Sequence, residues 1–261
     1  MAMATVATIT RNTASTMSTD NGMGRERWLI GVSVLALGLA LFALSAPRFV
    51  AYLELAYVPS SFDRALKAGR SVPAPALGFA RQQYGRALTA LPDDAVLQQD
   101  FARIELRRSV EPGVTLAQRH EALTSALRYI RASIVAAPAR AFAWSMDALI
   151  QAELTQQSGD VSTQLRMSYF LGPQETSSIL MRVQVAARLW DGLPEDVQIF
   201  VKHDFAKMWK QSEQRVTLID VYLRSGFRVR SAIRDSLPRG ARDIPAFDAL
   251  LAREIKKRSG S

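Results

Sequence analysis

Few side chains in this sequence could carry catalytic or metal chemistry. The chain has no cysteine and two histidines, His120 and His203. The lack of cysteine excludes disulfides, thiolate nucleophiles and the common structural zinc sites. Each histidine precedes one acidic residue, Glu121 or Asp204, and a metal ion would need further ligands from distant segments. A solvated helix face explains both pairs, so we assign no catalytic residue, no metal and no cofactor.

Two other kinds of active site lack support as well. The sequence has no Gly-x4-Gly-Lys loop, which is the usual phosphate-binding motif of nucleotide-dependent enzymes. Trp144, Trp190 and Trp209 could stack on sugars, but aromatic residues at helical spacing usually belong to a hydrophobic core. The sequence therefore predicts a protein that is not an enzyme.

Arginine supplies the clearest binding chemistry. Residues 51–201 hold 15 Lys or Arg against 15 Asp or Glu, whereas residues 202–258 hold 14 against 7, so the net charge of +9 is concentrated at the C-terminal end. Guanidinium groups on short helices and loops there could bind phosphate, carboxylate or acidic sugars. An ordinary solvated surface is the alternative. The candidate anionic-ligand patch comprises Arg224, Arg228, Arg230, Arg234, Arg239 and Arg242.

A membrane anchor would position these groups. The run WLIGVSVLALGLALFALSA, residues 28–46, has no charge across 19 positions, enough for a helix at about 1.5 Å per residue to cross a hydrocarbon core of roughly 30 Å. Trp28 lies at one edge, and Pro47 and Arg48 are expected to end the helix. A cleaved signal peptide with Ala43 and Ser45 near its cleavage site is the alternative, although hydrophobic regions of signal peptides are usually shorter.

The segments beside this helix suggest its orientation. Residues 1–27 are rich in Thr, Ala and Ser and are predicted to form a disordered cytoplasmic tail. Arg25 and Arg27 belong to a slight excess of basic residues before the helix, which favours an inner-membrane protein with its C-terminal domain in the periplasm of a bacterium. Residues 47–75 form a juxtamembrane segment, either along the membrane interface or as the first packed helix. With this orientation and no recognised binding motif, we expect no nucleic-acid partner.

Residues 76–201 contain a helical repeat. Prolines separate segments of helical periodicity, and proline is tolerated between helices but not inside them. Counting back from each proline gives one frame of small, bulky and small residues, which lets two helices approach closely. The three copies are Ala80-x3-Tyr84-x2-Ala87-x4-Pro92, Ala126-x3-Ile130-x2-Ser133-x4-Pro138 and Val161-x3-Leu165-x2-Ser168-x4-Pro173.

This frame resembles the tetratricopeptide-repeat family, whose second helix carries Ala-x3-Phe and a closing proline. Trp144 and Ala148 match the Trp and the small residue of that family's first helix, whereas Asp147 and Gln151 replace its Leu and Tyr. The proline spacings are 46 and 35 rather than 34, and residues 109–116 can absorb the first excess as a loop. The resemblance implies an α-solenoid of antiparallel helix pairs, with Trp144 buried and a concave face that receives a peptide or helix of a partner.

Further helices are predicted after the repeat. Pro194 should begin one, and others are expected at 215–225, 228–236 and 246–257, within the basic C-terminal helices of residues 202–261. No segment alternates at period two beside hairpin turns, so strands are not expected. The predicted fold is all-α: one transmembrane helix followed by a tetratricopeptide-like α-solenoid.

A second resemblance concerns the function. LRMSYFLGPQETSSILMRVQVAARLWDGLP, residues 165–194, is similar to the helical region of small single-pass accessory proteins of bacterial exopolysaccharide assembly. This resemblance implies a non-catalytic helper in polysaccharide synthesis or export. We therefore expect a membrane-anchored adaptor that holds a protein partner at the inner membrane. The alternative is a binding module that uses its basic C-terminal helices to contact an acidic polysaccharide or an anionic lipid.

Overall fold

The computed structural model describes residues 20–67, 72–155, 159–238, 240 and 243–259. Every regular element in these residues is a helix and none is a strand, which confirms the all-α prediction. The chain divides into two compact units, Met1–Phe49 and Val50–Ser261. The tail before residue 20 lies outside the described residues.

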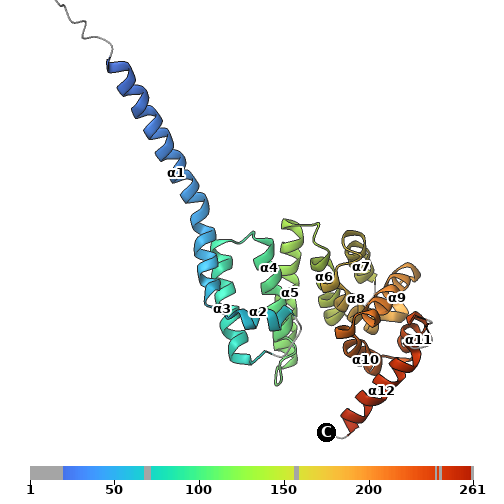
Figure 1. The fold of residues 1–261 in the computed structure, drawn as a ribbon. Coiled ribbons are helices and arrows are strands. Elements are labelled where there is room, and N and C mark those ends of the chain that lie inside the picture. The colour runs from blue at the N-terminus through green and yellow to red at the C-terminus, as the bar shows by residue number, and fades with distance from the viewer. Residues whose placement is uncertain (1–19, 68–71, 156–158, 239, 241–242, 260–261) are drawn as a thin grey trace, which may run out of the picture. The chain divides into compact units, whose positions relative to one another are not determined.

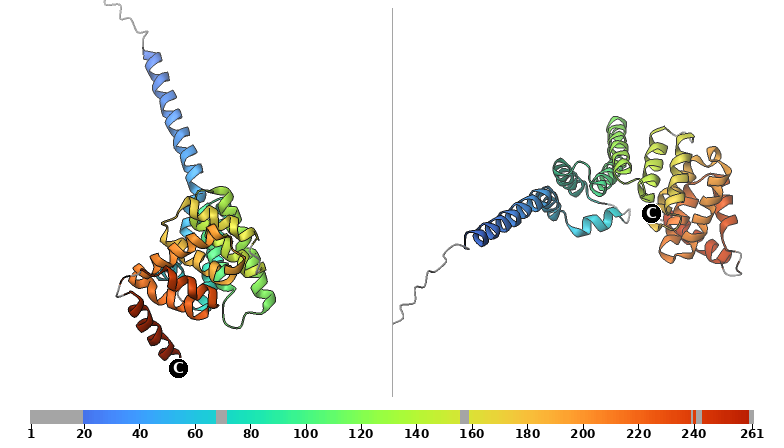
Figure 2. Two further views of the ribbon diagram at one scale, coloured as in Figure 1. Left: turned by 90° about the vertical axis from the view of Figure 1, so that its right-hand side faces the viewer. Right: turned by 90° about the horizontal axis from the view of Figure 1, so that it is seen from above.

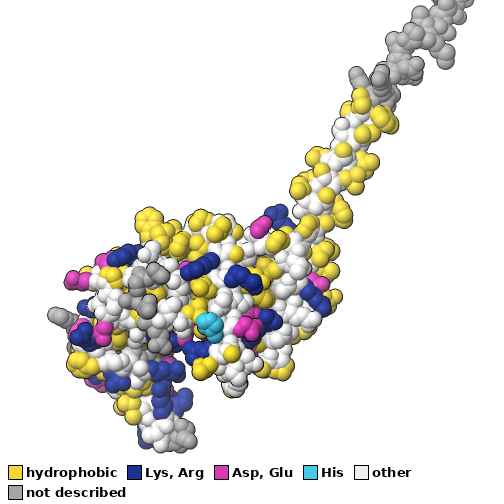
Figure 3. Space-filling model, turned by 180° about the vertical axis from the view of Figure 1, so that it is seen from behind, with side chains coloured by type: hydrophobic (Ala, Val, Ile, Leu, Met, Phe, Trp, Pro, Cys, Tyr) yellow, Lys and Arg dark blue, Asp and Glu magenta, His cyan; other side chains and the backbone are white. Residues whose placement is uncertain are grey.

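The first unit consists mainly of the long helix α1, Asp20–Ala56. Its stretch Trp28–Ala56 is long and apolar enough to span a membrane. Figure 3 shows exposed apolar side chains along the described part of this rod, from Trp28 onward. Two expected boundaries were wrong: the helix begins at Asp20, inside the expected tail, and it continues through Pro47 instead of ending there. A proline removes one backbone hydrogen bond, and the helical turns on both sides of it persist.

The last turns of α1 belong to the second unit. Ala51 is fully buried, and Leu55 packs against the same apolar cluster as Phe62 of α2, Ser60–Lys67. Glu54 lies 3.6 Å from Arg86. These contacts agree with the alternative in which the juxtamembrane segment begins the packed domain.

The second unit is a succession of helices in which most chain neighbours over residues 74–236 pack together (Figures 1 and 2). The boundary expected at residue 202 falls inside α9, so it marks a change in charge and not a structural break. The helices predicted near residues 195, 215, 228 and 246 are confirmed. The elements are α3 Ala74–Ala90, α4 Ala95–Arg108, α5 Leu116–Ala136, α6 Ala141–Thr155, α7 Gly159–Leu171, α8 Thr176–Leu189, α9 Glu195–Lys210, α10 Arg215–Arg224, α11 Phe227–Ser236 and α12 Asp243–Ser259. The exception to neighbour packing from α3 to α11 is α7 and α8, which pack on α6 and α9 more than on each other.

The three repeated prolines lie in turns of the same shape. Each is exposed, lies two residues after the end of α3, α5 or α7, and stands three residues before the first residue of the next helix. In each turn the residue before the proline donates its backbone N–H to the carbonyl of the last small residue of the frame, at 2.9–3.1 Å. The backbone N–H of the residue two positions after the proline donates to the carbonyl of the residue just before the proline, and this hydrogen bond closes the turn. The repeated sequence frame therefore produces a repeated local structure.

The helical residues of the frame are all buried. Tyr84 is the most exposed at 7%, whereas Ala80, Ala126, Ile130 and Leu165 are at 0%. Ala148, the predicted small position on α6, is also fully buried. These burials agree with the close approach of helices that the frame predicts.

Trp144 differs from its prediction. Its side chain is half-buried instead of enclosed, and its indole N–H donates to the carbonyl of Pro138 at 2.8 Å. Gln98 holds the equivalent place, six residues after Pro92, and donates to that proline's carbonyl in the same way. The hydrogen bond of Trp144 therefore stabilises the turn before α6, and its side chain adds less buried apolar surface to the core than expected.

Candidate functional site

The two histidines lie apart from any candidate metal centre. His120 on α5 and His203 on α9 are exposed. In the part of the chain that the structure describes, no group of three or more His, Cys, Asp or Glu side chains could hold a metal ion. Asp204 and Glu121 are engaged otherwise: Asp204 is buried against Arg182, and Glu121 lies 3.0 Å from Arg108.

The tryptophans do not form an exposed platform. Trp190 and Trp209 are 8% and 1% exposed. Trp190 stacks on Phe205, and Trp209 packs at an angle against Phe247. Both side chains belong to one hydrophobic core cluster, as helical spacing predicts.

The candidate arginine patch is surface-exposed but largely engaged. Four of its guanidinium groups donate to acceptors of the protein itself, and three of them have a carboxylate partner that offsets their charge. Arg239 and Arg242 lie outside the described residues. The pairs are Arg224 with Asp220, Arg228 with Asp191, Arg230 with the carbonyls of Tyr222 and Leu223, and Arg234 with the Tyr222 hydroxyl and Asp248.

Arg234 illustrates this engagement. Its Nε donates to the Tyr222 hydroxyl at 3.2 Å, and its guanidinium also pairs with Asp248 of α12. The hydrogen bond to Tyr222 and the charge of Asp248 raise the pKa of Arg234. This arginine therefore links α10, α11 and α12, and a role in holding these helices together explains its position.

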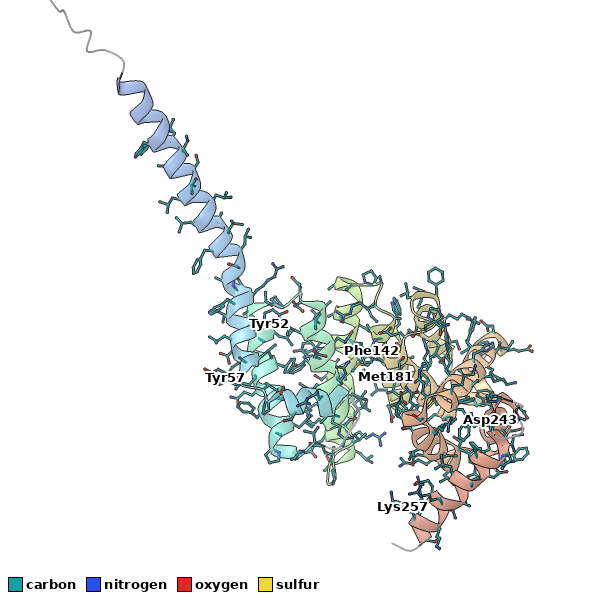
Figure 4. All side chains as sticks on the ribbon, viewed as in Figure 1. Tyr52, Tyr57, Phe142, Met181, Asp243 and Lys257 are labelled. Atoms are coloured by element: carbon teal, nitrogen blue, oxygen red, sulfur yellow. The ribbon has the colours of Figure 1, made fainter. Side chains whose placement is uncertain are left out.

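A groove on the second unit offers a larger binding surface. It encloses about 1190 Å³ and is lined mainly by residues of α4, α6, α8 and α10, together with Leu66 of α2 and Leu171 of α7. Most of the lining residues therefore lie on even-numbered helices, and Leu171 is the one described lining residue on α7. Figure 4 labels Phe142 on α6 and Met181 on α8, which belong to one packed cluster and lie together at the groove wall.

The groove combines apolar and charged side chains. Leu106, Val110, Phe142, Leu180 and Met181 are among its apolar lining residues. Its charged residues are the five arginines Arg103, Arg107, Arg140, Arg188 and Arg224 and the three acids Glu153, Glu175 and Asp220. The lining therefore carries an excess of positive charge beside apolar surface.

Sequence reasoning missed this groove because it treated residues 51–201 as electrically neutral. Arg103 and Arg107 are spaced i, i+4 on α4, so they lie on one helix face, and that spacing was a usable signal. On the same helix, Asp100 pairs with Arg103 and Glu105 pairs with other arginines, so within the described residues Arg107 has no carboxylate partner. Of the predicted patch, the groove includes Arg224 alone.

A buried charge network stabilises the helices behind the groove. Arg182 and Asp204 are both fully buried, and their side chains are joined at 2.9 Å. The Tyr169 hydroxyl donates to the same carboxylate at 2.8 Å. Burial raises the pKa of Asp204 and, together with the negative charge of Asp204, raises that of Tyr169. The network ties α7, α8 and α9 together and is closed to solvent, so its role is structural.

Comparison with known proteins adds no relative: no protein-family model, no curated protein and no solved structure matches this chain.

Proposed function

We propose that this chain is a membrane-anchored helical adaptor, in which a tetratricopeptide-like solenoid holds a partner protein at the bacterial inner membrane. The observation that supports it best is the groove, which is lined mainly by α4, α6, α8 and α10. In solenoids, stacking of helix pairs creates an extended concave surface of this kind for partners. The apolar anchor Trp28–Ala56 would keep that surface at the membrane.

In this proposal the N-terminus is cytoplasmic and the groove is periplasmic, and the protein serves as a non-catalytic helper in exopolysaccharide synthesis or export. Orientation is tested separately from binding. In spheroplasts, external protease should remove a C-terminal tag while a cytosolic control protein survives. A protected tag would reverse the orientation and leave the groove in the cytoplasm.

Site-specific photocrosslinking in living cells tests the adaptor role. A benzophenone amino acid at Gln184, which lines the groove on α8, should give a discrete crosslinked band that contains a second protein. The matched control is Gln82, an exposed residue of α3 outside the groove lining. A band of equal intensity from both positions, or none from Gln184, would contradict the proposal.

The end of α12 supports a second candidate function, the binding of an anionic polymer or lipid. Arg253, Lys256 and Lys257 are exposed there, beside the exposed apolar residue Ile255. Basic and apolar side chains on one helix suit an anionic membrane surface. Binding to vesicles with anionic lipid should then fall steeply as salt rises from about 0.1 to 0.5 M, because screening shortens the range of these charges. Salt-independent binding would exclude it.

A further inference from the structure

Two arginines of the groove have no partner among the residues that the structure describes. Arg107 on α4 and Arg140, just before α6, are half-buried and line the groove. Within those residues, neither guanidinium makes a hydrogen bond or an ion pair. A cation that is partly removed from water and left unpaired is unfavourable. The wall of the groove therefore lacks two counter-charges.

The acidic residues of the groove do not supply counter-charges for Arg107 and Arg140. Glu153 accepts from Arg119 and Arg188 at 2.6 and 2.5 Å. Asp220 pairs with Arg224 at 3.0 Å. These two carboxylates already have a cation. Glu175, the third acid of the groove, accepts hydrogen bonds from the Ser177 and Ser178 hydroxyls at 2.9 and 3.1 Å and, within the described residues, pairs with neither arginine. A counter-charge for Arg107 and Arg140 is therefore left to an occupant.

Apolar surface restricts what that occupant can be. Phe142 is held in place by the Arg103 guanidinium, whose central carbon lies 4.6 Å from the ring centroid. Met181 and Leu180 of α8 continue the apolar wall. Methionine adapts its shape to different apolar partners. A simple polyanion would leave this wall in contact with water, whereas a protein segment with apolar side chains would cover it.

The elements around the groove also restrict the backbone of the occupant. The described lining residues lie on helices and their junctions, where the helical backbone groups are already bonded along the chain. An extended peptide would find no sheet edge with which to pair. A helix satisfies its own backbone hydrogen bonds and can bury one apolar face.

We infer that the groove takes an amphipathic helix of a partner protein, with Asp or Glu beside its apolar stripe. This inference rests on the proposed function, because it assumes that the groove is the partner site. The carboxylates pair with Arg107 and Arg140, and the apolar stripe packs on Val110, Leu180 and Met181, which are more exposed than Phe142. The volume of about 1190 Å³ exceeds the usual range of about 300–1,000 Å³ for small-molecule pockets, in keeping with a macromolecular occupant.

A displayed peptide library tests the inference with the full chain in detergent. The probe is a set of helix-forming 18-residue peptides that vary between Leu, Phe and Ala on one face and between Glu, Gln and Lys beside it. Selection on the native protein should enrich peptides that have both an apolar stripe and Glu. The variant Arg107→Gln/Arg140→Gln should bind the selected peptides at least about tenfold more weakly, whereas Lys202→Gln/Lys210→Gln, on α9 outside the groove, should bind them unchanged. Circular dichroism and thermal unfolding verify that both variants fold.

The outcomes separate the inference from the proposed function. Enrichment of apolar helices without preference for Glu would overturn the acidic partner and leave the groove as a partner site. If the variant Gln184→Trp, which obstructs the groove, selects the same peptides as the native protein, the groove itself is refuted. Binding of alginate that depends on Arg107 and Arg140, with no helix selected, would assign the groove to an acidic polysaccharide and overturn the inference.

Discussion

Replacing Arg182 by methionine should destabilise the second unit in a pH-dependent manner. The Arg182 Nε donates to Asp204 at 2.9 Å, and Nη1 donates to the carbonyl of Gly172 at 3.1 Å. The guanidinium carbon also lies 4.2 Å from the centroid of the Tyr169 ring. Methionine retains much of the apolar stem, but it leaves the buried carboxylate of Asp204 without its principal cation.

The expected loss in the free energy of unfolding of this variant is similar by two physical routes. Removing one partner of a buried ion pair costs about 3–5 kcal/mol. Alternatively Asp204 takes up a proton, which for an aspartate with an ordinary pKa of about 3.9 costs about 4 kcal/mol at pH 7 and about 1.5 kcal/mol at pH 5. We therefore expect a loss of about 4 kcal/mol in the free energy of unfolding at neutral pH.

The sign of the pH dependence follows from proton binding. Burial already raises the pKa of Asp204, and the charge of Arg182 opposes that effect. Without Arg182 the pKa rises further, so the folded variant holds a proton that the unfolded chain releases above about pH 4. Its stability should therefore fall by about 1.4 kcal/mol per pH unit as the pH rises, until the pKa of the folded state is passed.

Urea unfolding of the full chain in detergent, followed by the helical circular dichroism signal from pH 5 to pH 8, measures this loss. The double variant Arg182→Met/Asp204→Asn has no charge at the pair and keeps an acceptor for Tyr169, so it should recover most of the stability at pH 7 and lose the slope. Lys202→Met, an exposed control on α9, should change stability by less than about 0.5 kcal/mol. Equal destabilisation of the Arg182→Met variant at pH 5 and pH 8, or a double variant no more stable than the single one, would refute the reasoning.

Three further changes test the junctions and a second buried carboxylate. Trp144→Phe should lose about 1 kcal/mol in urea unfolding, because it removes the hydrogen bond to Pro138; an unchanged midpoint would contradict that role. Gly172→Ala should lower the free energy of unfolding by about 1–3 kcal/mol, because the new Cβ would lie 2.6 Å from the Cβ of Ala141. If this clash is the cause, adding Ala141→Gly to that variant should restore stability. Burial raises the pKa of Asp147, so the native protein should lose stability as the pH rises above about 4. The Asp147→Asn variant should therefore be more stable than the native protein at pH 7 and depend less on pH. A less stable Asn variant would show that the charge of Asp147 is favourable.

Local patterns in the sequence determined the helices and their junctions. The spacing of Ala80, Tyr84 and Pro92 depends on contacts within a few turns, and the structure repeats both the burial and the turn at each copy. The uncharged run from Trp28 likewise predicted the apolar helix. The predicted end of that helix was wrong because Pro47 removes a single backbone hydrogen bond. The packing of Ala51 and Leu55 in one apolar cluster with Phe62 of α2 supports the turns that follow.

Tertiary structure decided which charged groups are free. The sequence placed its candidate site at the arginines of α10 and α11, yet Arg228 and Arg234 find acids on other segments, 37 and 14 residues away. Arg107 and Arg140 lie in a stretch of balanced charge, but within the described residues they remain unpaired in the groove. Charge pairing depends on distances between residues that are far apart in the chain. Helical periodicity fixes which side of a helix a residue occupies, and only the packing of the helices fixes what that side meets.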